Sequence, residues 1–541
     1  MPPDRPPDAE RSRPGGAASP TAGGGAPEGR FARLLGPPAS PRRRVVVNGI
    51  WTSSAFVANA LLMFFVSPIV VSTLGEVSYG IWAIVLSLTG YFGFADLGVR
   101  PAIVYYIARH DALGEHEEVN RYVNTAFSTL LVCGLVLFGL AALAAPHVPH
   151  WFKDIPAGRA HEASVATLIT GLTFALTLPL NAFSAVVVGK QHYRTLVSID
   201  LVVLALKAGA TVVVLKSGYG LVGLALVNLG ADLVEMGAKS AAAFRILPTL
   251  RFAPWLLTVD RAKRLLGYGG RAILVSLSQL LIWRTDAMVI GATISAKAAG
   301  HFAIGAMLPF YARGFAGAAG RVLTPAASAL EARGDLAGLR ALLTRGSRSM
   351  LLVSVAMLVY LVAAGEPFLA QWQGEAFRGG PATVLLILSL GALGPIAGQP
   401  FEAILYGTNR MRALAALSIV EGVANLALSI ALVFPLGIVG VALGTAIPSL
   451  LVRLVALPMY AAREFGGTYG ELARRAWTVP VAAGLVTFAV LRLVVRPADA
   501  IGWPALLGLA AGCQVVFLAI YALLARRAPR SLRLPELEAT A

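Results

Sequence analysis

Positively charged side chains lie inside long apolar segments of this 541-residue sequence. A charge at the centre of a bilayer costs roughly 2.5–3.5 kcal/mol on insertion scales, so such residues are expected to face a hydrated cavity or an opposite charge. If they converge, guanidinium and ammonium groups are suited to a phosphate or pyrophosphate. Static ion pairs are the alternative. The candidates for this cationic set are Arg284, Arg313, Arg321, Arg100 and Lys207.

Carboxylates occur in the same kind of segment and provide the opposite charge. In a cavity they would balance the cations or carry a coupled proton or other cation. Asp96 precedes Arg100 by four residues, which is the spacing of an ion pair on one helical face. Arg100 is also close to the end of its segment, where a long side chain can reach the membrane surface. The carboxylate candidates are Asp232, Glu235, Asp286, Glu421 and Asp96.

The composition indicates a membrane protein. Hydrophobic residues make up 57% of the chain and charged residues 13%, whereas soluble domains contain about a quarter charged residues. Continuous apolar runs of about 20 residues favour spanning helices over a β-barrel. We therefore expect an all-α polytopic membrane protein with about fourteen transmembrane helices. The predicted spans are 45–73, 79–108, 122–145, 163–188, 198–217, 219–244, 268–292, 299–327, 349–371, 382–407, 414–434, 437–460, 477–495 and 502–525.

The distribution of the basic residues predicts the orientation. The formal net charge of +17 would suggest nucleic acid as the partner of a soluble protein. With a cytoplasmic N-terminus, however, the predicted inward loops and C-terminal tail hold 23 Lys and Arg residues, and the outward loops hold six. This is the positive-inside bias. We expect both termini in the cytoplasm and no binding of nucleic acid.

Parts of the sequence recur at a nearly constant offset. Residues 220–226 reappear as residues 437–443, and the segment 189–194 resembles 407–412. Residues 80–84 and 114–115 resemble residues 220 positions further on. A repeat of this kind predicts two related lobes of six helices each, in the same orientation in the membrane.

The repeat leads to a predicted division of the chain. The Pro- and Gly-rich residues at the N-terminus predict a disordered tail. Aromatic and basic residues after the sixth span predict an amphipathic linker at the membrane surface. The predicted parts are a cytoplasmic tail (1–44), an N-lobe with spans 1–6 (45–244), a cytoplasmic amphipathic linker (245–267), a C-lobe with spans 7–12 (268–462), and spans 13 and 14 with a C-terminal tail (463–541).

Motifs in both halves resemble a known superfamily. They are formed by Leu74, Gly75, Tyr79, Gly80, Ile81, Trp82, Gly90, Tyr91, Asp96, Leu97 and Gly98, and by Arg284, Thr285, Asp286, Gly300, His301, Phe302 and Ala303. The sequence resembles the polysaccharide-transporter branch of the MOP exporter superfamily over most of residues 45–525. This resemblance implies a V-shaped fold of two lobes and alternating access. It also implies export of an undecaprenyl-pyrophosphate-linked oligosaccharide, as by a Wzx-like flippase.

The functional hypothesis is therefore a flippase of the bacterial cytoplasmic (inner) membrane, active in O-antigen, exopolysaccharide or capsule biosynthesis. By analogy with lipid II flippases, Arg284, Arg313 and Arg321 would hold the pyrophosphate. Arg100 and Lys207 would line the path. The expected partners are the lipid-linked oligosaccharide, membrane lipids and other polysaccharide assembly proteins.

Three other classes stay open at this stage. A multidrug/cation antiporter of the same superfamily would require a cavity dominated by carboxylates. A membrane enzyme of glycan assembly is disfavoured by short outward loops without a catalytic constellation, and a non-transporting scaffold by the charged interior. No nucleotide-binding GxxxxGK[ST] motif occurs. We expect no cofactor and no metal site, and coupling to protons, to sodium ions or to the membrane potential.

Overall fold

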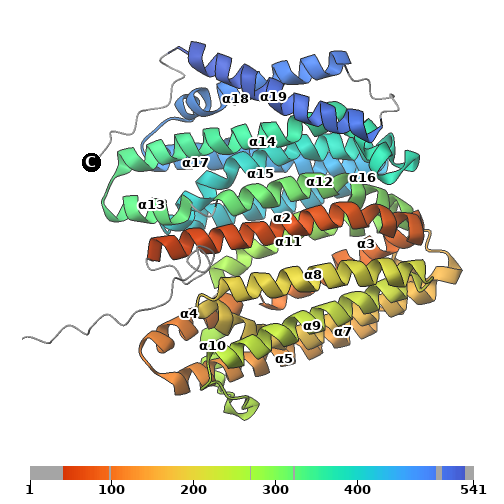
Figure 1. The fold of residues 1–541 in the computed structure, drawn as a ribbon, viewed down its shortest axis with the longest axis vertical. Helices are drawn as coiled ribbons and strands as arrows, with labels where there is room; N and C mark the ends of the chain where they lie inside the picture. The colour runs from red at the N-terminus through yellow and green to blue at the C-terminus, as the bar shows by residue number, and fades with distance from the viewer. Residues whose placement is uncertain (1–40, 97–98, 269, 321–322, 495–501, 530–541) are drawn as a thin grey trace, which may run out of the picture. The chain divides into compact units, whose positions relative to one another are not determined.

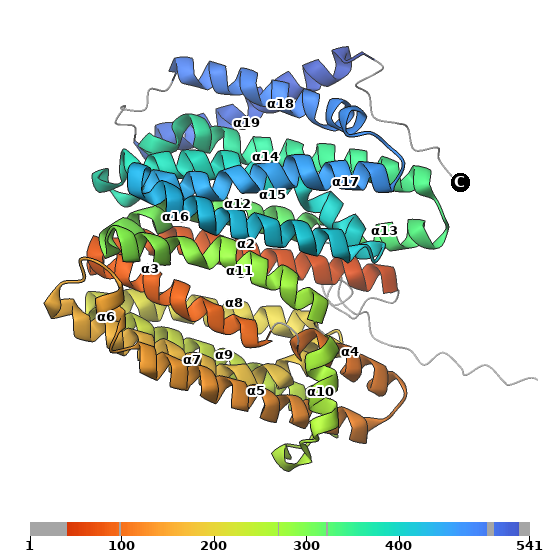
Figure 2. The same ribbon diagram turned by 180° about the vertical axis from the view of Figure 1, so that it is seen from behind.

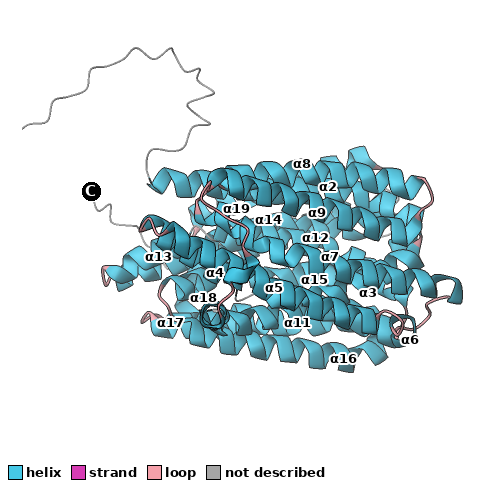
Figure 3. Ribbon diagram, turned by 90° about the horizontal axis from the view of Figure 1, so that it is seen from below, coloured by secondary structure: helices cyan, strands magenta, loops and turns pink. Residues whose placement is uncertain are grey.

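The computed structural model describes residues 41–96, 99–268, 270–320, 323–494 and 502–529, and all elements in these ranges are helical. Figure 3 shows the helices and their connecting loops. The elements are α2 (Pro41–Leu74), α3 (Glu76–Gly90), η1 (Tyr91–Asp96), α4 (Val99–Ala112), α5 (His116–Ala144), α6 (Val148–Trp151), α7 (Ala157–Gly189), α8 (Tyr193–Lys216), α9 (Gly220–Ile246), η2 (Pro254–Leu256), α10 (Val259–Tyr268), α11 (Gly270–Thr293), α12 (Ala296–Gly320), α13 (Leu323–Ala332), α14 (Leu336–Gln373), η3 (Glu375–Phe377), α15 (Gly380–Gly407), α16 (Met411–Leu450), η4 (Leu451–Ala456), α17 (Leu457–Glu464), α18 (Tyr469–Val494) and α19 (Trp503–Arg527).

The chain divides into residues 1–47 and residues 48–541. In the first unit, residues 41–47 are the first turns of α2, and the predicted tail up to residue 40 lies outside the described residues. All other elements belong to the second unit, to which the following description applies. Figure 1 shows its long helices lying side by side.

Ten helical runs in the described residues are long and apolar enough to cross a membrane. The prediction of an all-α membrane protein is thus confirmed, while the number of fourteen spans stays a prediction. Two predicted spans, 414–434 and 437–460, fall within the continuous run Met411–Glu464, which bends at Gly437 with φ 59°. The predicted span 79–108 is divided among α3, η1 and α4.

Turn geometry recurs at the offsets that the sequence predicts. Gly114 and Gly334 precede α5 and α14 with φ of 73° and 68°. Gly220 and Gly437 open the two copies of the apolar motif with φ of 56° and 59°. Only glycine adopts such angles without a steric penalty, which explains why glycine occupies these four positions.

An ion pair also recurs at an offset of 220 residues in both partners. Lys190 Nζ lies 2.7 Å from Asp111 Oδ1, and Arg410 Nη2 lies 3.3 Å from Glu331 Oε1. In each pair, the carboxylate lies in the last turn of one helix and the cation lies in the loop that follows another helix. All four residues belong to the predicted cytoplasmic loops. Equivalent positions in the two halves thus make equivalent contacts.

The connector between the predicted lobes is held by two asparagines of α5. The side chain of Asn120 bonds the backbone of Thr249 and Arg251, and Asn124 does the same with Arg251 and Ala253, at 2.6–2.8 Å. The helix that follows, α10, runs across the direction of α5 and α7 (Figure 2). Trp255, just before it, is 79% exposed. The position of this segment at a membrane surface stays a prediction.

Helices α3 and α12 approach each other at two glycines. A Cβ atom at Gly80 would lie 1.8 Å from the carbonyl oxygen of Ala296, and one at Gly300 would lie 3.0 Å from Gly80 Cα. Polar contacts lie one turn away, where Glu76 Oε2 is 3.0 Å from Lys297 Nζ and 2.7 Å from His301 Nε2. This contact joins the predicted N-lobe directly to the predicted C-lobe.

We expect Gly80→Ala to destabilise the protein, because the added methyl group cannot fit without moving the backbone of α3 or α12. Overpacking of this kind costs about 1–3 kcal/mol. Thermal unfolding of the detergent-solubilised protein measures the effect. Gly209→Ala in α8 is the matched control, because a Cβ there meets no atom within 4 Å. Equal unfolding temperatures for the two variants would contradict the close contact.

We expect the contact at Glu76 to weaken in acid. Burial alone would raise the pKa of the Glu76 carboxyl, but hydrogen bonds from Lys297 and His301 outweigh it and hold the pKa below its ordinary value. A carboxyl with a depressed pKa stabilises the folded state above its unfolded-state pKa, about 4.3, and this contribution is lost as pH falls through the folded-state value.

The unfolding temperature, compared at about pH 6 and about pH 3.5, should therefore fall less for Glu76→Gln than for the wild type. Glu375→Gln serves as the control, because Glu375 pairs with Arg378 only at an exposed site, where ion pairs contribute little. The same pH dependence in the wild type and Glu76→Gln would exclude this role.

Candidate functional site

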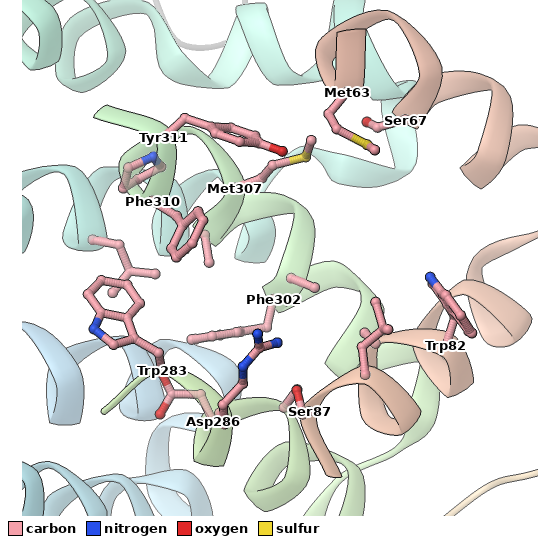
Figure 4. A pocket seen from close by; sticks show the side chains of 18 of the residues that line it. Met63, Ser67, Trp82, Ser87, Trp283, Asp286, Phe302, Met307, Phe310 and Tyr311 are labelled. Atoms are coloured by element: carbon pink, nitrogen blue, oxygen red, sulfur yellow. The ribbon is translucent and has the colours of Figure 1, made fainter. Parts of the chain in front are cut away.

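A cavity of about 820 Å³ lies among the long helices, enclosed by residues from α2, α3, α8, α9, α11, α12, α15 and α16. Most of its wall is apolar. Figure 4 shows Trp283, Phe310 and Tyr311 on one side and Trp82 on another, with open space between them. Helices from both predicted lobes therefore contribute to one chamber.

Three ionisable side chains from the sequence-based candidates line this cavity: Lys207, Arg284 and Asp286. They come from α8 and α11, and they are accompanied by the neutral polar side chains of Asn228 and Gln279. The cavity thus combines an apolar and aromatic wall with a small number of charges. Pockets that bind small molecules commonly have this composition.

Arg284 is exposed at the cavity and packs on α3. A Cβ atom at Gly90 would lie 2.7 Å from Arg284 Nε, so the glycine provides room for the guanidinium. Next to it, the hydroxyls of Tyr91 and Thr285 lie 2.5 Å apart. Within the described part of the chain, no carboxylate lies within ion-pair distance of Arg284. Its five N–H donors are therefore available to an anion in the cavity.

Asp286 is buried beside the cavity and is held through one of its two oxygens. Oδ2 accepts a hydrogen bond from Thr445 Oγ1 at 2.9 Å, and Asn425 Nδ2 donates to the same hydroxyl at 2.8 Å. Asp286 Oδ1 and Asn425 Oδ1 are both buried and have no hydrogen-bond partner in the described structure. Two acceptor oxygens without a donor are therefore gathered around Thr445.

Lys207 has a carboxylate partner, unlike Arg284. Its Nζ lies 3.1 Å from Asp232 Oδ1, so the pair joins α8 to α9. A second group lies on the same two helices, where Lys239 Nζ is 2.7 Å from Asp200 and 2.6 Å from Glu235. Two of the carboxylate candidates, Asp232 and Glu235, thus neutralise lysines.

Arg313 lies behind the cavity wall. It stacks on the indole of Trp283, with Cζ 4.2 Å from the ring centroid, and donates to Gln279 Oε1 at 2.7 Å. Trp283 and Gln279 line the cavity, whereas Arg313 does not. The structure therefore places this arginine where it can hold two wall residues in position.

Glu421 belongs to a buried ion cluster that is also separate from the cavity lining. Arg453 Nε lies 2.6 Å from Glu421 Oε2, and its Nη1 bonds Glu402. Arg453 and Glu421 are 1% and 2% exposed. Because Arg453 and Glu421 are this deeply buried and bonded to each other, the cluster has the features of a structural element.

Among the remaining candidates, only Arg100 has a described side chain. Arg100 is exposed on α4 and does not line the cavity. The side chain of Asp96, the last residue of η1, and the whole of Arg321 lie outside the described residues. The described candidates therefore do not all converge on one anion site.

The structure adds residues that the sequence pattern did not single out. Gln279, Trp283 and Thr445 are neutral, and their types are common in membrane helices. Asn425 does share a one-face pattern with Ser418, Glu421 and Ser429, which indicates a polar face of α16. The spacing of these residues could have identified Asn425, but it does not reveal that Asn425 reaches Asp286 of α11 through Thr445.

The arrangement of helices resembles that of solved membrane transporters. A lipid II flippase, MurJ, in an inward closed conformation matches with a TM-score of 0.66 and 11% identity, over 89% of this chain and 99% of that chain. An inward-facing multidrug resistance MATE family transporter of the MOP superfamily matches with a TM-score of 0.64 and 15% identity, over 76% of this chain and 94% of that chain. At these identities the likeness shows the fold.

Sequence comparison places the chain within a family. Residues 45–331 match the model of the polysaccharide biosynthesis protein family, and the chain belongs to that family. It is also 23% identical to the uncharacterized membrane protein EpsK of Bacillus subtilis (strain 168), over 79% of this chain and 86% of that protein. The resemblance to the polysaccharide branch of the superfamily is thus confirmed, as is the location in a membrane.

Proposed function

We propose that the protein is a flippase that moves an undecaprenyl-pyrophosphate-linked oligosaccharide across the bacterial cytoplasmic membrane by alternating access. The observation that carries the proposal is the cavity, in which the exposed guanidinium of Arg284 stands in a largely apolar and aromatic chamber. An amphiphile of this kind needs a cation for its pyrophosphate and a low-polarity wall for the adjoining groups.

The family and the fold support a transporter in polysaccharide assembly rather than an enzyme. A protein named as a lipid II flippase shares the fold, and so do multidrug transporters. The fold alone therefore leaves the antiporter alternative open. The cavity favours the flippase, because two of its three lining ionisable candidates are cations and Arg284 has no carboxylate partner in the described structure.

The proposal includes the topology predicted from the loops, with both termini in the cytoplasm. In that orientation, the duplicated ion pairs Lys190–Asp111 and Arg410–Glu331 lie on the cytoplasmic side. Membrane lipids and other proteins of polysaccharide assembly are the further proposed partners.

We expect Arg284→Ala to reduce export by about 10- to 100-fold, because a hydrogen bond to a charged group contributes about 1.5–3 kcal/mol. The assay is complementation of a gene deletion, with undecaprenyl-linked glycan quantified on the cytoplasmic side and the variant protein quantified in membranes. Arg100→Ala is the matched control and should export normally, because this exposed arginine does not line the cavity.

Full export by Arg284→Ala would remove this arginine from the proposed site. A deletion strain that accumulates no undecaprenyl-linked glycan but has altered drug tolerance would instead support the multidrug antiporter.

We further propose that Asp286 carries the coupling cation, a proton or a sodium ion. The support is geometric: the carboxylate borders the cavity, has no cationic partner in the described structure, and has a buried oxygen without a donor. Proton binding would turn Oδ1 into a donor. A sodium ion would instead use the oxygens of Asp286, Asn425 and Thr445, which are the hard ligands such cations require.

We expect Asp286→Asn to abolish the response of transport to an imposed cation gradient, because the amide cannot bind or release a proton and removes the negative charge. Transport in proteoliposomes under a pH gradient and under a sodium gradient identifies which cation couples. Asp200→Asn is the matched control, because Lys239 keeps Glu235 as its partner. An unchanged gradient response in Asp286→Asn would contradict this role.

A further inference from the structure

Three side chains at the cavity wall form a polar and aromatic cluster that the binding of a prenyl chain alone would not require. Arg313, Trp283 and Gln279, here called the Trp283 cluster, connect α12 to α11. Arg313 Nη2 and Trp283 Nε1 both bond Gln279 Oε1, at 2.7 and 3.2 Å. Arginine and the indole N–H can only donate, so the atom that they share must be the amide oxygen. The side-chain amide of Gln279 is thereby held in one orientation.

This orientation leaves the amide nitrogen of Gln279 free for a ligand. Gln279 lines the cavity, and its Nε2 has no hydrogen-bond partner within the described part of the chain. Nε2 is also absent from the fully buried polar atoms that lack a partner. It therefore remains accessible, and it presents two N–H donors beside the cavity.

The indole of Trp283 provides an aromatic surface next to these donors. Arg313 covers one face of the ring, with Cζ 4.2 Å from the centroid, and Trp283 lines the cavity whereas Arg313 does not. Phe310 meets the indole at a centroid distance of 5.6 Å and an angle of 67°. Figure 4 shows Trp283 and Phe310 on the same side of the cavity.

A sugar ring matches this combination of an aromatic surface and amide donors. A pyranose has C–H groups that carry a slight positive charge and suit the negative face of an aromatic ring. Its rim of hydroxyls can accept from the amide of Gln279. A prenyl chain would also cover the aromatic rings, but it would leave the amide donors without acceptors, which is costly.

We propose that the Trp283 cluster is a subsite for the sugar ring that is attached to the pyrophosphate. Trp283 supplies the stacking surface, Gln279 donates to a hydroxyl, and Arg313 is a positioning residue that holds both. The ring next to the pyrophosphate is favoured because Arg284, which would bind the pyrophosphate, lines the same cavity as Trp283 and Gln279. This inference rests on the proposed function, and it gives Arg313 a role different from the pyrophosphate binding expected from the sequence.

The test compares two lipids that differ only in the sugar. One is the undecaprenyl-pyrophosphate-linked oligosaccharide isolated from cells that lack the gene, and the other is undecaprenyl pyrophosphate. Equilibrium binding of both to the full-length protein is measured in detergent micelles. The variants are Arg313→Met and Gln279→Met, which keep the side-chain volume but remove the cation or the amide. Arg492→Met is the matched control, because it removes a cation that stands 5.5 Å over Phe488 in α18.

The wild type should bind the glycosylated lipid about tenfold more tightly than undecaprenyl pyrophosphate. Either cluster variant should reduce this preference to about threefold or less, with affinity for undecaprenyl pyrophosphate changed less than about twofold. Arg492→Met should keep the preference. Gln279→Met provides the test even if Arg313→Met fails to fold.

Several results would overturn the inference. Equal losses of affinity for both lipids in Arg313→Met would assign this arginine to the pyrophosphate. An unchanged preference in both cluster variants would exclude the subsite, as would a wild type that binds both lipids equally well. The last result would leave the proposed function intact, whereas a wild type that binds neither lipid would contradict the proposed function itself.

Discussion

The cost of placing an ionised side chain in a low-dielectric region governs how the charges of this protein are arranged. Lys239 lies between Asp200 and Glu235, and Arg453 is held between Glu402 and Glu421. Each cation therefore has two carboxylate partners, at least one of them on another helix, and each group keeps a net charge of −1 when both carboxylates are ionised. These groups join α8 to α9 and α15 to α16. They therefore fix the relative position of helices more specifically than apolar contacts alone would.

Half of the candidates with described side chains, namely Lys207, Asp232, Glu235 and Glu421, form ion pairs, which makes the unpaired ones informative. Arg284 and Asp286 are separated by one residue in α11, yet the described structure shows no ion pair between them. The guanidinium is exposed at the cavity beside Gly90, whereas the carboxylate is buried against Thr445 of α16. One helix therefore presents two different chemistries to the same chamber, one suited to an anion and the other to a small cation.

The cavity depends on contacts between the two halves of the sequence. Helix α3 reaches α12 through Gly80 and Gly300, and the polar contacts of Glu76 lie at the same place. Since both helices contribute cavity residues, a change in this contact would also change the shape of the chamber. The repeated glycine turns and the repeated ion pairs, by contrast, join residues of the same half. They occur at equivalent positions in the two halves.

The sequence by itself determined the class of fold, because continuous apolar runs with few charges can only be satisfied by helices in a membrane. Its motifs identified the family, and its repeats marked equivalent positions such as Gly114 and Gly334, which the structure shows to share a positive φ. Arg284 and Asp286 could be proposed because a charge within an apolar segment is visible without a structure.

The tertiary structure decided which of those charges can be functional. Residue type does not distinguish Arg284 from Arg313, and only packing shows that one is exposed in the cavity while the other stacks on Trp283. Nor could the pairing of Glu421 with Arg453, 32 residues away, be read from spacing on one helix. The physical reason is that an ion pair, or a free charge, depends on which helices meet, and contact between distant segments is not encoded in local periodicity.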